Sequence, residues 1–341
     1  MKILFHDLYA DLNVNNKLFE DENTAIGDDL LKPFHVLAKL AEKQGVEVGT
    51  WAKISKESAD AIVFVDYPKI NDPVFQYAIH HDVKKYLISL ESPIISKRGI
   101  ATSCHDSFDK IFTWSDDLVA ANPQKYIKIN YSFDTPPSFA EGYRSKHCIV
   151  IAGNKGSSAP NELYSERLKC IKWFEEHAPS DFDLYGLQWD LVLWNSDKLT
   201  GRIFNKINRQ IRFFRQNFNV YKGAVERKRA VMSLYNFSLC LENVHGYNGY
   251  ITEKIFDCLF AGTIPIYKGA RNIAGYIPQS CFVNYDDFNS ISDMHDFITG
   301  ISSGQVLAYQ KNIKAFLQSK DFEPFLSTTF ANTVLSNIVC D

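Results

Sequence analysis

The chain has 341 residues, of which 45% are hydrophobic and 23% charged, and its formal net charge is -3. This composition is typical of a folded globular protein and excludes disordered and collagen-like chains. The slightly acidic balance argues against a protein whose main task is to coat nucleic acid, so any basic site is local. The length exceeds that of one compact core and predicts two domains with a cleft between them.

The cysteines and the N-terminal residues indicate a cellular compartment. The seven cysteines are scattered, without a Cys-x-x-Cys pair or histidines at zinc-ligand spacing. This pattern favours a reducing compartment, so we expect a cytoplasmic protein. Met1–Asp7 holds an apolar run too short for a signal peptide and predicts a β-strand. No stretch approaches the roughly 18 apolar residues of a membrane span, so any membrane contact is expected at its surface.

Strand-like and helix-like segments alternate in the first part of the chain, which predicts a parallel sheet covered by helices. A break with paired prolines at Ser132–Ser138 predicts a linker. The predicted strands are Lys2–Phe5, Val46–Thr50, Ala61–Asp66, Tyr86–Leu90 and Lys110–Trp114, with a helix at about Asp29–Gln44.

A second alternating region follows the linker. Its predicted elements are a strand at Cys148–Ala152, a helix at about Asn161–Glu176, a strand at Phe237–Leu241, a helix that begins near Thr252 and ends at Gly262, and a strand at Ile264–Tyr267. We therefore predict an α/β protein with two Rossmann-like domains facing a cleft. The expected divisions are residues 1–143, residues 144–325, and a tail at 326–341 that packs back on the first domain.

Arg167 interrupts an apolar stripe, because at roughly 100° per residue Tyr164, Cys170 and Phe174 share its helical face. One interpretation is an arginine that extends past the edge of the core or pairs with an acid such as Asp183. The other is a guanidinium that binds phosphate oxygens in bidentate fashion.

The sequence Thr252-Glu253-Lys254 predicts a helix start. Thr252 is suited to the N-cap and Glu253 to the first turn, where the helix dipole favours an acid. Lys254 in the same turn is unfavourable unless an anion lies nearby. Free backbone N–H groups, the dipole and a cation together predict a phosphate site.

These residues belong to a block that resembles the signature of the α-1,3/4-fucosyltransferase family, also called glycosyltransferase family 10. The block consists of Phe237–Asn243, Gly249–Asp257, Ala261–Tyr267, Cys281–Asn284 and Asp286–Phe288. Weaker similarity covers Asn154–Arg167, Asp183–Gly186 and Leu90–Pro93. The resemblance implies a GT-B fold, a GDP-fucose donor and an α-linked product formed with inversion at the anomeric carbon.

The resemblance also implies roles for particular residues. Glu91 falls at the position of the catalytic base, and Arg167 at the arginine that grips phosphate; Asp66 and Glu162 are alternatives for the base. Lys254 is a second phosphate ligand by spacing and resemblance together. Further candidates are Glu253 for ribose or fucose hydroxyls, Asn243 and Tyr250 for the sugar pocket, and Lys222 for phosphate or guanine.

Two features bear on the donor. The loop Val244–Gly249 has a length that varies among relatives, so a different GDP- or dTDP-linked deoxysugar is an alternative donor. Asp181-Phe182-Asp183 has the form of a metal-binding pair, but it leads directly into a predicted strand. We therefore expect no required cofactor and no essential divalent metal, because cations of the chain already neutralise the diphosphate.

The stretch Lys198–Arg229 alternates basic with apolar residues and contains few acids. A helix at about Thr200–Phe218 would be amphipathic, able to rest on anionic lipid; the alternative is an ordinary helix with a solvated basic face.

Together with the resemblance, these patterns imply an inverting, cytoplasmic fucosyltransferase that acts on a glycan, a lipid-linked precursor of surface polysaccharide, with an α-1,3 linkage. We expect the protein to bind peripherally to the inner face of the membrane, through the basic stretch Lys198–Arg229. A non-catalytic glycan-binding module is the alternative from another class, and a nucleic-acid partner is not expected. The loops Ala10–Asp28 and Ser92–Ser107 are expected to select the acceptor, whose identity the residues do not reveal.

Overall fold

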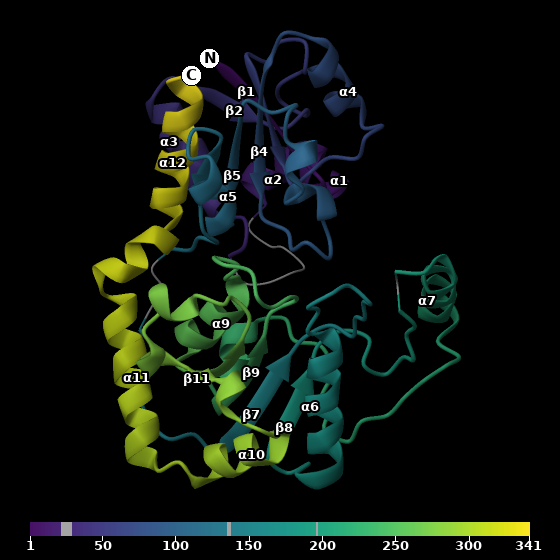
Figure 1. Cartoon of the computed structure of the whole chain (residues 1–341), viewed down its shortest axis with the longest axis vertical. Coiled ribbons are helices and arrows are strands. Elements are labelled where there is room, and N and C mark those ends of the chain that lie inside the picture. Colours follow the sequence, from purple (N-terminus) through teal and green to yellow (C-terminus); the bar gives the residue numbers. More distant parts are fainter. Residues whose placement is uncertain (22–28, 135–137, 196) are drawn as a thin grey trace. The chain divides into compact units, whose positions relative to one another are not determined.

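The computed structural model describes residues 1–21, 29–134, 138–195 and 197–341. The chain divides into two compact units, each an α/β fold around one parallel sheet (Figure 1). Unit 1 comprises Met1–Pro136, Asn248–Ile251 and Lys320–Asp341, and unit 2 comprises Pro137–Tyr247 and Thr252–Ser319. The centre of the predicted linker Ser132–Ser138 and the end of the loop Ala10–Asp28 lie outside the described residues.

Unit 1 contains a six-stranded sheet in the order β2-β1-β3-β4-β5-β6, with every neighbouring pair parallel. Side chains alternate between its two faces, as the strand period of two requires. Phe5 and Val63 enter one core cluster, whereas Leu4 and Ile62 enter the other. The strands are β1 (Lys2–Asp7), β2 (Glu47–Gly49), β3 (Ala61–Val65), β4 (Lys84–Ser89), β5 (Lys110–Thr113) and β6 (Tyr126–Lys128).

Helices cover both faces of this sheet. The core cluster on the first face includes Leu37 of α3 together with Phe330 and Leu335 of α12, the helix near the C-terminus. The opposite cluster includes Phe75 of α4. The helices are α1 (Ala10–Asn13), α2 (Lys17–Glu20), α3 (Lys32–Lys43), α4 (Pro73–His80), α5 (Asp116–Ala121) and α12 (Ser327–Val339).

Unit 2 contains a five-stranded parallel sheet in the order β11-β10-β9-β7-β8. Its central strand β9 is buried along its whole length, which is expected where helices lie on both faces. The strands are β7 (Lys146–Ile151), β8 (Phe182–Tyr185), β9 (Tyr235–Leu241), β10 (Ile264–Lys268) and β11 (Val283–Asn284). The helices are α6 (Tyr164–His177), α7 (Leu199–Ile211), α8 (Lys228–Met232), α9 (Glu253–Ala261), α10 (Ile291–Gly300) and α11 (Ser303–Leu317).

Local signals in the sequence set the limits of α9. Thr252 is its N-cap, and the Thr252 side chain accepts a hydrogen bond from the backbone of Lys254. Gly262 ends the helix in the left-handed conformation, with φ of 65°. The parallel sheets confirm the predicted α/β fold, and α9 begins and ends where the sequence predicts.

The prediction of one helix over Thr200–Phe218 was wrong at its C-terminal end. The helix α7 stops at Ile211, because Arg212 adopts the left-handed conformation with φ of 51°. The Arg212 guanidinium pairs with Asp190, and the chain then turns back to form a bridge between Leu191 and Arg215. Within the described ranges, no helix is long and apolar enough to cross a membrane.

Candidate active site

Three carboxyl groups gather at one edge of the sheet of unit 1. Asp7 ends β1, Asp66 directly follows β3, and Glu91 lies in the loop after β4. These strands are neighbours in the sheet and run parallel, so their carboxyl ends meet at the same edge. This is the edge at which α/β folds place ligands.

Hydrogen bonds fix Glu91 within this group. A carboxylate oxygen of Asp66 accepts hydrogen bonds from the backbone N–H groups of Leu90 and Glu91, both at 2.8 Å. Asp66 itself adopts the left-handed conformation, with φ of 59°. The Tyr9 hydroxyl donates to Oε1 of Glu91 at 2.5 Å. In the described parts of the chain Glu91 has no ion-pair partner, so the Tyr9 hydroxyl is the side-chain group that contacts its carboxylate.

Burial and charge repulsion shift the titration of the neighbouring acids. Burial raises the pKa of Asp66 to about 8, and the nearby charge of Glu91 adds to the effect. Burial likewise raises the pKa of Asp7 to about 7, although a hydrogen bond from the backbone N–H of Tyr9 lowers it in part. Asp66 is therefore mostly protonated near neutral pH, and Asp7 is partly protonated, beside Glu91.

Arg167 lies on the inner face of α6, and its side chain is 4% exposed. Its Nη2 donates to the backbone oxygens of Leu241 and Glu242, at 2.6 and 3.2 Å. Across the described residues these are the hydrogen bonds of the guanidinium, whose Nε and Nη1 donate none, and its carbon lies 5.6 Å from the centroid of the Tyr164 ring. The predicted alternative of a pair with Asp183 is not found, because Asp183 bonds Lys146 and Tyr235.

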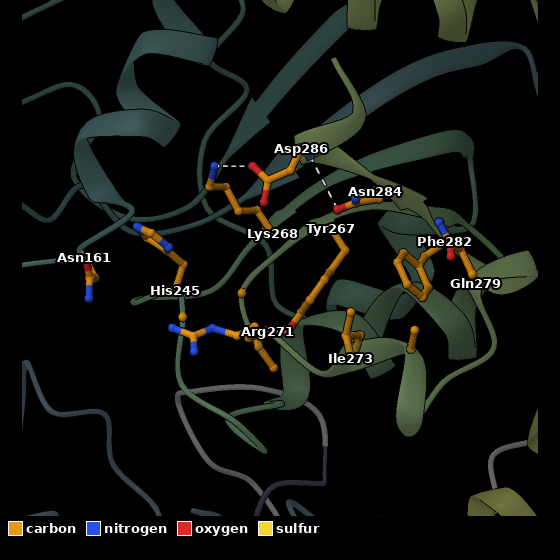
Figure 2. Close-up of a pocket in the computed structure, with 14 residues that line it drawn as sticks. Asn161, His245, Tyr267, Lys268, Arg271, Ile273, Gln279, Phe282, Asn284 and Asp286 are labelled. Atoms are coloured by element: carbon orange, nitrogen blue, oxygen red, sulfur yellow. Dashed lines mark hydrogen bonds and ion pairs between the residues drawn. The ribbon is translucent and has the colours of Figure 1, made fainter. Parts of the chain in front are cut away.

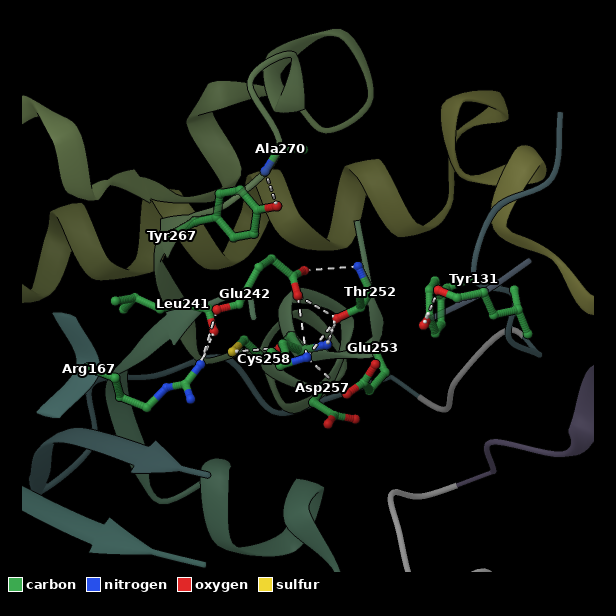
Figure 3. Close-up of polar contacts among 12 residues, drawn as sticks. Tyr131, Arg167, Leu241, Glu242, Thr252, Glu253, Asp257, Cys258, Tyr267 and Ala270 are labelled. Atoms are coloured by element: carbon green, nitrogen blue, oxygen red, sulfur yellow. Dashed lines mark hydrogen bonds and ion pairs between the residues drawn. The ribbon is translucent and has the colours of Figure 1, made fainter. Parts of the chain in front are cut away.

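A second polar cluster surrounds the N-terminus of α9. Glu242 is fully buried at the end of β9, and its carboxylate accepts from the backbone N–H of Thr252 at 2.9 Å and from its hydroxyl at 2.7 Å. The ammonium of Lys254 lies 3.3 Å from carboxylate oxygens of both Glu242 and Glu253. Figure 3 shows Glu242 between Arg167 and Thr252. The structure thus brings Arg167 and Lys254 together around the end of β9.

The charges in this cluster depend on one another. Burial opposes the charge of Lys254, but the carboxylates of Glu253 and Glu242 raise the pKa of Lys254 above its usual value. Burial also works against the charge of Glu253, yet the ammonium groups of Lys254 and Lys228 lower its pKa to about 2. Burial raises the pKa of Glu242, and Lys254 offsets part of that rise. Lys254 therefore stays a cation at physiological pH.

The other predicted site residues lie in different places. Asn243 directly follows Glu242, and its backbone oxygen accepts from Leu163. Tyr250 belongs to the short segment of unit 1, where its ring packs edge-on against Trp114 with 4.8 Å between ring centroids. Lys222 lies 3.5 Å from Asp183, beside the edge strand β8, and β7 separates that strand from β9.

A pocket of about 440 Å³ opens at the carboxyl ends of β9 and β10 (Figure 2). It borders the Lys254 cluster, because Gly269 in its lining lies against the Glu242 side chain. Neither Arg167 nor Lys254 lines it. Its polar lining includes His245 and Arg271, which have no ion-pair partner among the residues that the structure describes. The predicted site residues did not include these two or the buried Glu242, although all three follow predicted strands.

The two acids of Asp181-Phe182-Asp183 form hydrogen bonds with side chains of unit 2. Asp181 bonds His295 at 3.0 Å, and Asp183 bonds Lys146 at 2.9 Å. Within the described residues there is no group of three His, Cys, Asp or Glu side chains placed to hold a metal ion.

The fold is that of GT-B glycosyltransferases, which combine two parallel-sheet α/β domains. A crystal structure of an α1,3-fucosyltransferase with GDP-fucose superposes with a TM-score of 0.54 and 15% identity, over 98% of this chain and 89% of that one. An α-glucosyltransferase in complex with UDP and DNA superposes with a TM-score of 0.56 and 13% identity over the full length of both chains. At these identities the likeness concerns the fold.

Part of the sequence is similar to a known family. Residues 188–323 match the C-terminal region of glycosyltransferase family 10 (fucosyltransferase). The chain is 34% identical over 123 residues to an α-(1,3)-fucosyltransferase of Helicobacter pylori, which is 33% of this chain and 25% of that protein. It is 29% identical over 126 residues to the mouse 4-galactosyl-N-acetylglucosaminide 3-α-L-fucosyltransferase 9, or 35% of this chain and 34% of that protein. The match thus spans a quarter to a third of these relatives.

Proposed function

We propose that this protein transfers L-fucose from GDP-fucose to a hydroxyl group of a glycan, with an α-1,3 linkage. The observation that supports the proposal is that Arg167 and Lys254 both contact Glu242 at the end of β9, the lysine inside the matched region 188–323 and the arginine outside it. A guanidinium with free donors, an ammonium and the N–H groups of a helix start make a site for a diphosphate. The relatives named above support fucose as the sugar.

We propose the following chemistry for this transfer. In a single displacement, an acceptor oxygen forms a bond to the anomeric carbon while the bond from that carbon to GDP breaks, which inverts the configuration. Glu91 takes the proton of the acceptor hydroxyl, and Tyr9 holds its carboxylate. Arg167 and Lys254 stabilise the charge that develops on the departing diphosphate, an effect of about 3 kcal/mol for each preorganised group.

The remaining candidate residues contact the donor. Glu253 bonds hydroxyl groups of the ribose or the fucose, and Asn243 and Tyr250 line the sugar site. Lys222 contributes to phosphate or guanine binding if it leaves Asp183, with which it pairs here. The reaction needs no divalent metal, because cations of the chain meet the diphosphate.

We place the reaction on the cytoplasmic side, where the product would be a precursor of surface polysaccharide. All seven cysteines lie in the described part of the chain and are free thiols, which suits a reducing compartment.

Nucleotide binding is the first test. A ligand that binds the native state raises its melting temperature, so GDP, UDP, dTDP and CMP are compared by thermal shift. We expect GDP to give the largest rise. A larger rise with dTDP would identify a different deoxysugar donor, and the absence of a rise with all four would contradict the proposal.

Three variants then separate catalysis from binding. Glu91→Gln is expected to abolish fucosyl transfer and leave the affinity for GDP nearly intact, whereas Arg167→Ala and Lys254→Ala weaken GDP binding. Lys172→Ala on the exposed side of α6 is the matched control. Full transfer by Glu91→Gln would remove Glu91 as the base, and GDP binding without transfer by the unaltered protein would favour a glycan-binding module.

A further inference from the structure

The helix α7 packs against its own unit with its polar face. In Figure 1 it lies at the end of two connecting segments, apart from the sheet of unit 2. The buried residues of α7 are Gly201, Asn205 and Asn208. A helix on a protein surface normally buries its apolar face. In α7 one large apolar side chain packs inward, that of Phe204, whose ring stacks on Trp194 with 4.1 Å between ring centroids.

Hydrogen bonds to the preceding and following segments hold this orientation. Asn205 exchanges two bonds of 2.7 Å with the backbone of Trp194. The Asn208 amide donates to the backbone oxygens of Val192 and Phe214, and its oxygen accepts from the N–H of Phe214. A Cβ atom at Gly201 would lie 1.9 Å from the Asn195 oxygen, so glycine is required for this close approach. The polar face is therefore fixed inward by specific contacts.

The outward face carries large apolar side chains. At roughly 100° per residue, positions four apart drift slowly around a helix and form one continuous stripe. The stripe consists of Leu199, Ile203, Ile207 and Ile211, which are 65%, 52%, 48% and 60% exposed. Phe213, just beyond the helix, is 74% exposed. Apolar groups gathered in this way mark an interaction surface.

Basic side chains flank this stripe. Lys198, Arg202 and Lys206 have no ion-pair partner in the part of the chain that the structure describes. The two acids of residues 187–218 face other groups: Asp190 pairs with Arg212, and Asp197 bonds Ser157. The surface thus combines exposed aliphatic groups with uncompensated positive charge.

We propose that α7 and Phe213 dock on an anionic lipid bilayer, with the helix lying in the plane of the interface. Charge complementarity selects this partner, because aliphatic side chains enter the acyl boundary while the flanking cations meet anionic headgroups. A second copy of the chain would bring the same cations against each other. The docking involves no donor chemistry, so it stands apart from the proposed fucosyl transfer.

Co-sedimentation with lipid vesicles tests this docking. The full chain is mixed with vesicles of phosphatidylcholine alone or with about 30 mol% phosphatidylserine, at low and high salt. We expect binding to the anionic vesicles that weakens as salt increases. Arg202→Glu with Lys206→Glu is expected to weaken it about tenfold or more. Ile203→Ser with Ile207→Ser is expected to weaken it to a similar extent.

A matched control makes the same change of charge elsewhere on unit 2. Lys172→Glu with Lys311→Glu makes the same change of charge on exposed sites of α6 and α11 and is expected to bind like the unaltered protein. A cooperative thermal unfolding transition at an unchanged temperature reports that each variant is folded. Three results would each overturn the proposal. The first is equal binding to neutral and anionic vesicles, and the second is full binding by either α7 variant. The third is that the chain does not bind vesicles and instead associates with itself through α7.

Discussion

The hydroxyl of Tyr9 donates a hydrogen bond of 2.5 Å to Oε1 of Glu91, although 82 positions separate the two residues in the chain. Tyr9 directly precedes α1, and Glu91 follows β4, so the parallel sheet brings them to one edge. A hydrogen bond to a carboxylate is stronger than one between neutral groups and fixes the direction of the acid. Tyr9 is thus a positioning residue for Glu91.

Tyr9→Phe tests this role. We expect kcat for the proposed fucosyl transfer to fall about tenfold while the affinity for GDP is unchanged, because the carboxylate loses its orientation and the proposed phosphate site is intact. Steady-state kinetics with GDP titration measures both quantities. Tyr143→Phe removes a hydroxyl from an exposed tyrosine and serves as the control. Unchanged kcat in Tyr9→Phe would show that Tyr9 does not position the base.

The buried carboxyl of Asp66 predicts a pH dependence of stability. Its pKa is raised to about 8, whereas an aspartate in an unfolded chain titrates near 3.9. Between these values the native state holds a proton that the unfolded state has lost, so the free energy of unfolding decreases as pH rises through this window. Asp7, whose pKa is raised to about 7, contributes with the same sign.

Asp66→Asn keeps an oxygen that accepts from Leu90 and Glu91 but does not ionise. Relative to the unaltered protein, we expect it to gain stability from about pH 5 to pH 9, on the order of a few kcal/mol. Thermal unfolding across that range measures the difference. Asp82→Asn, on the surface of the same unit, is expected to show no such trend. A constant difference between Asp66→Asn and the unaltered protein would exclude a buried proton at this site.

The sequence reveals those features of the fold and the candidate site whose signals lie within a few neighbouring residues. The cap Thr252 and the terminator Gly262 are local, and α9 begins and ends as predicted. The edge strands β6 and β11, which have three and two residues, are absent from the predicted strands, whereas the three-residue β2 lies within the predicted strand Val46–Thr50. Arg167 stood out because it interrupts a helical period, and the structure buries it as that period implies.

Residues whose importance depends on long-range contacts were harder to find. Nothing near Tyr9 in the sequence indicates its bond to Glu91, because the sheet topology alone brings them together. Glu242 lies in the segment Phe237–Asn243 that resembles the family signature, but nothing in that segment indicates its burial or its bonds to Thr252, which lies ten positions away. The end of α7 depends on the pairing of Arg212 with Asp190, a contact between separate segments.

Glu242→Ala is expected to destabilise the protein. The change leaves the hydroxyl and N–H of Thr252 without their acceptor and removes one of the two carboxylates near the Lys254 ammonium. Breaking a buried pair in this way costs about 3 kcal/mol. Urea unfolding measures the loss, and Glu226→Ala at an exposed site is the control. A loss below about 1 kcal/mol would show that the cluster contributes little to stability.

Gly262→Ala is expected to lower the free energy of unfolding for two reasons, strain in the backbone and a steric clash with Phe139. The residue ends α9 with φ of 65°, a conformation that disfavours a side chain. An added Cβ would also lie 2.2 Å from Cδ2 of Phe139, so the ring would have to move. We expect a loss of about 2 kcal/mol or more. At Gly300, the last residue of α10, a Cβ would meet nothing within 4 Å, so Gly300→Ala should be neutral or slightly stabilising. Equal melting temperatures for the two variants would contradict the tight packing of Phe139 on the end of α9.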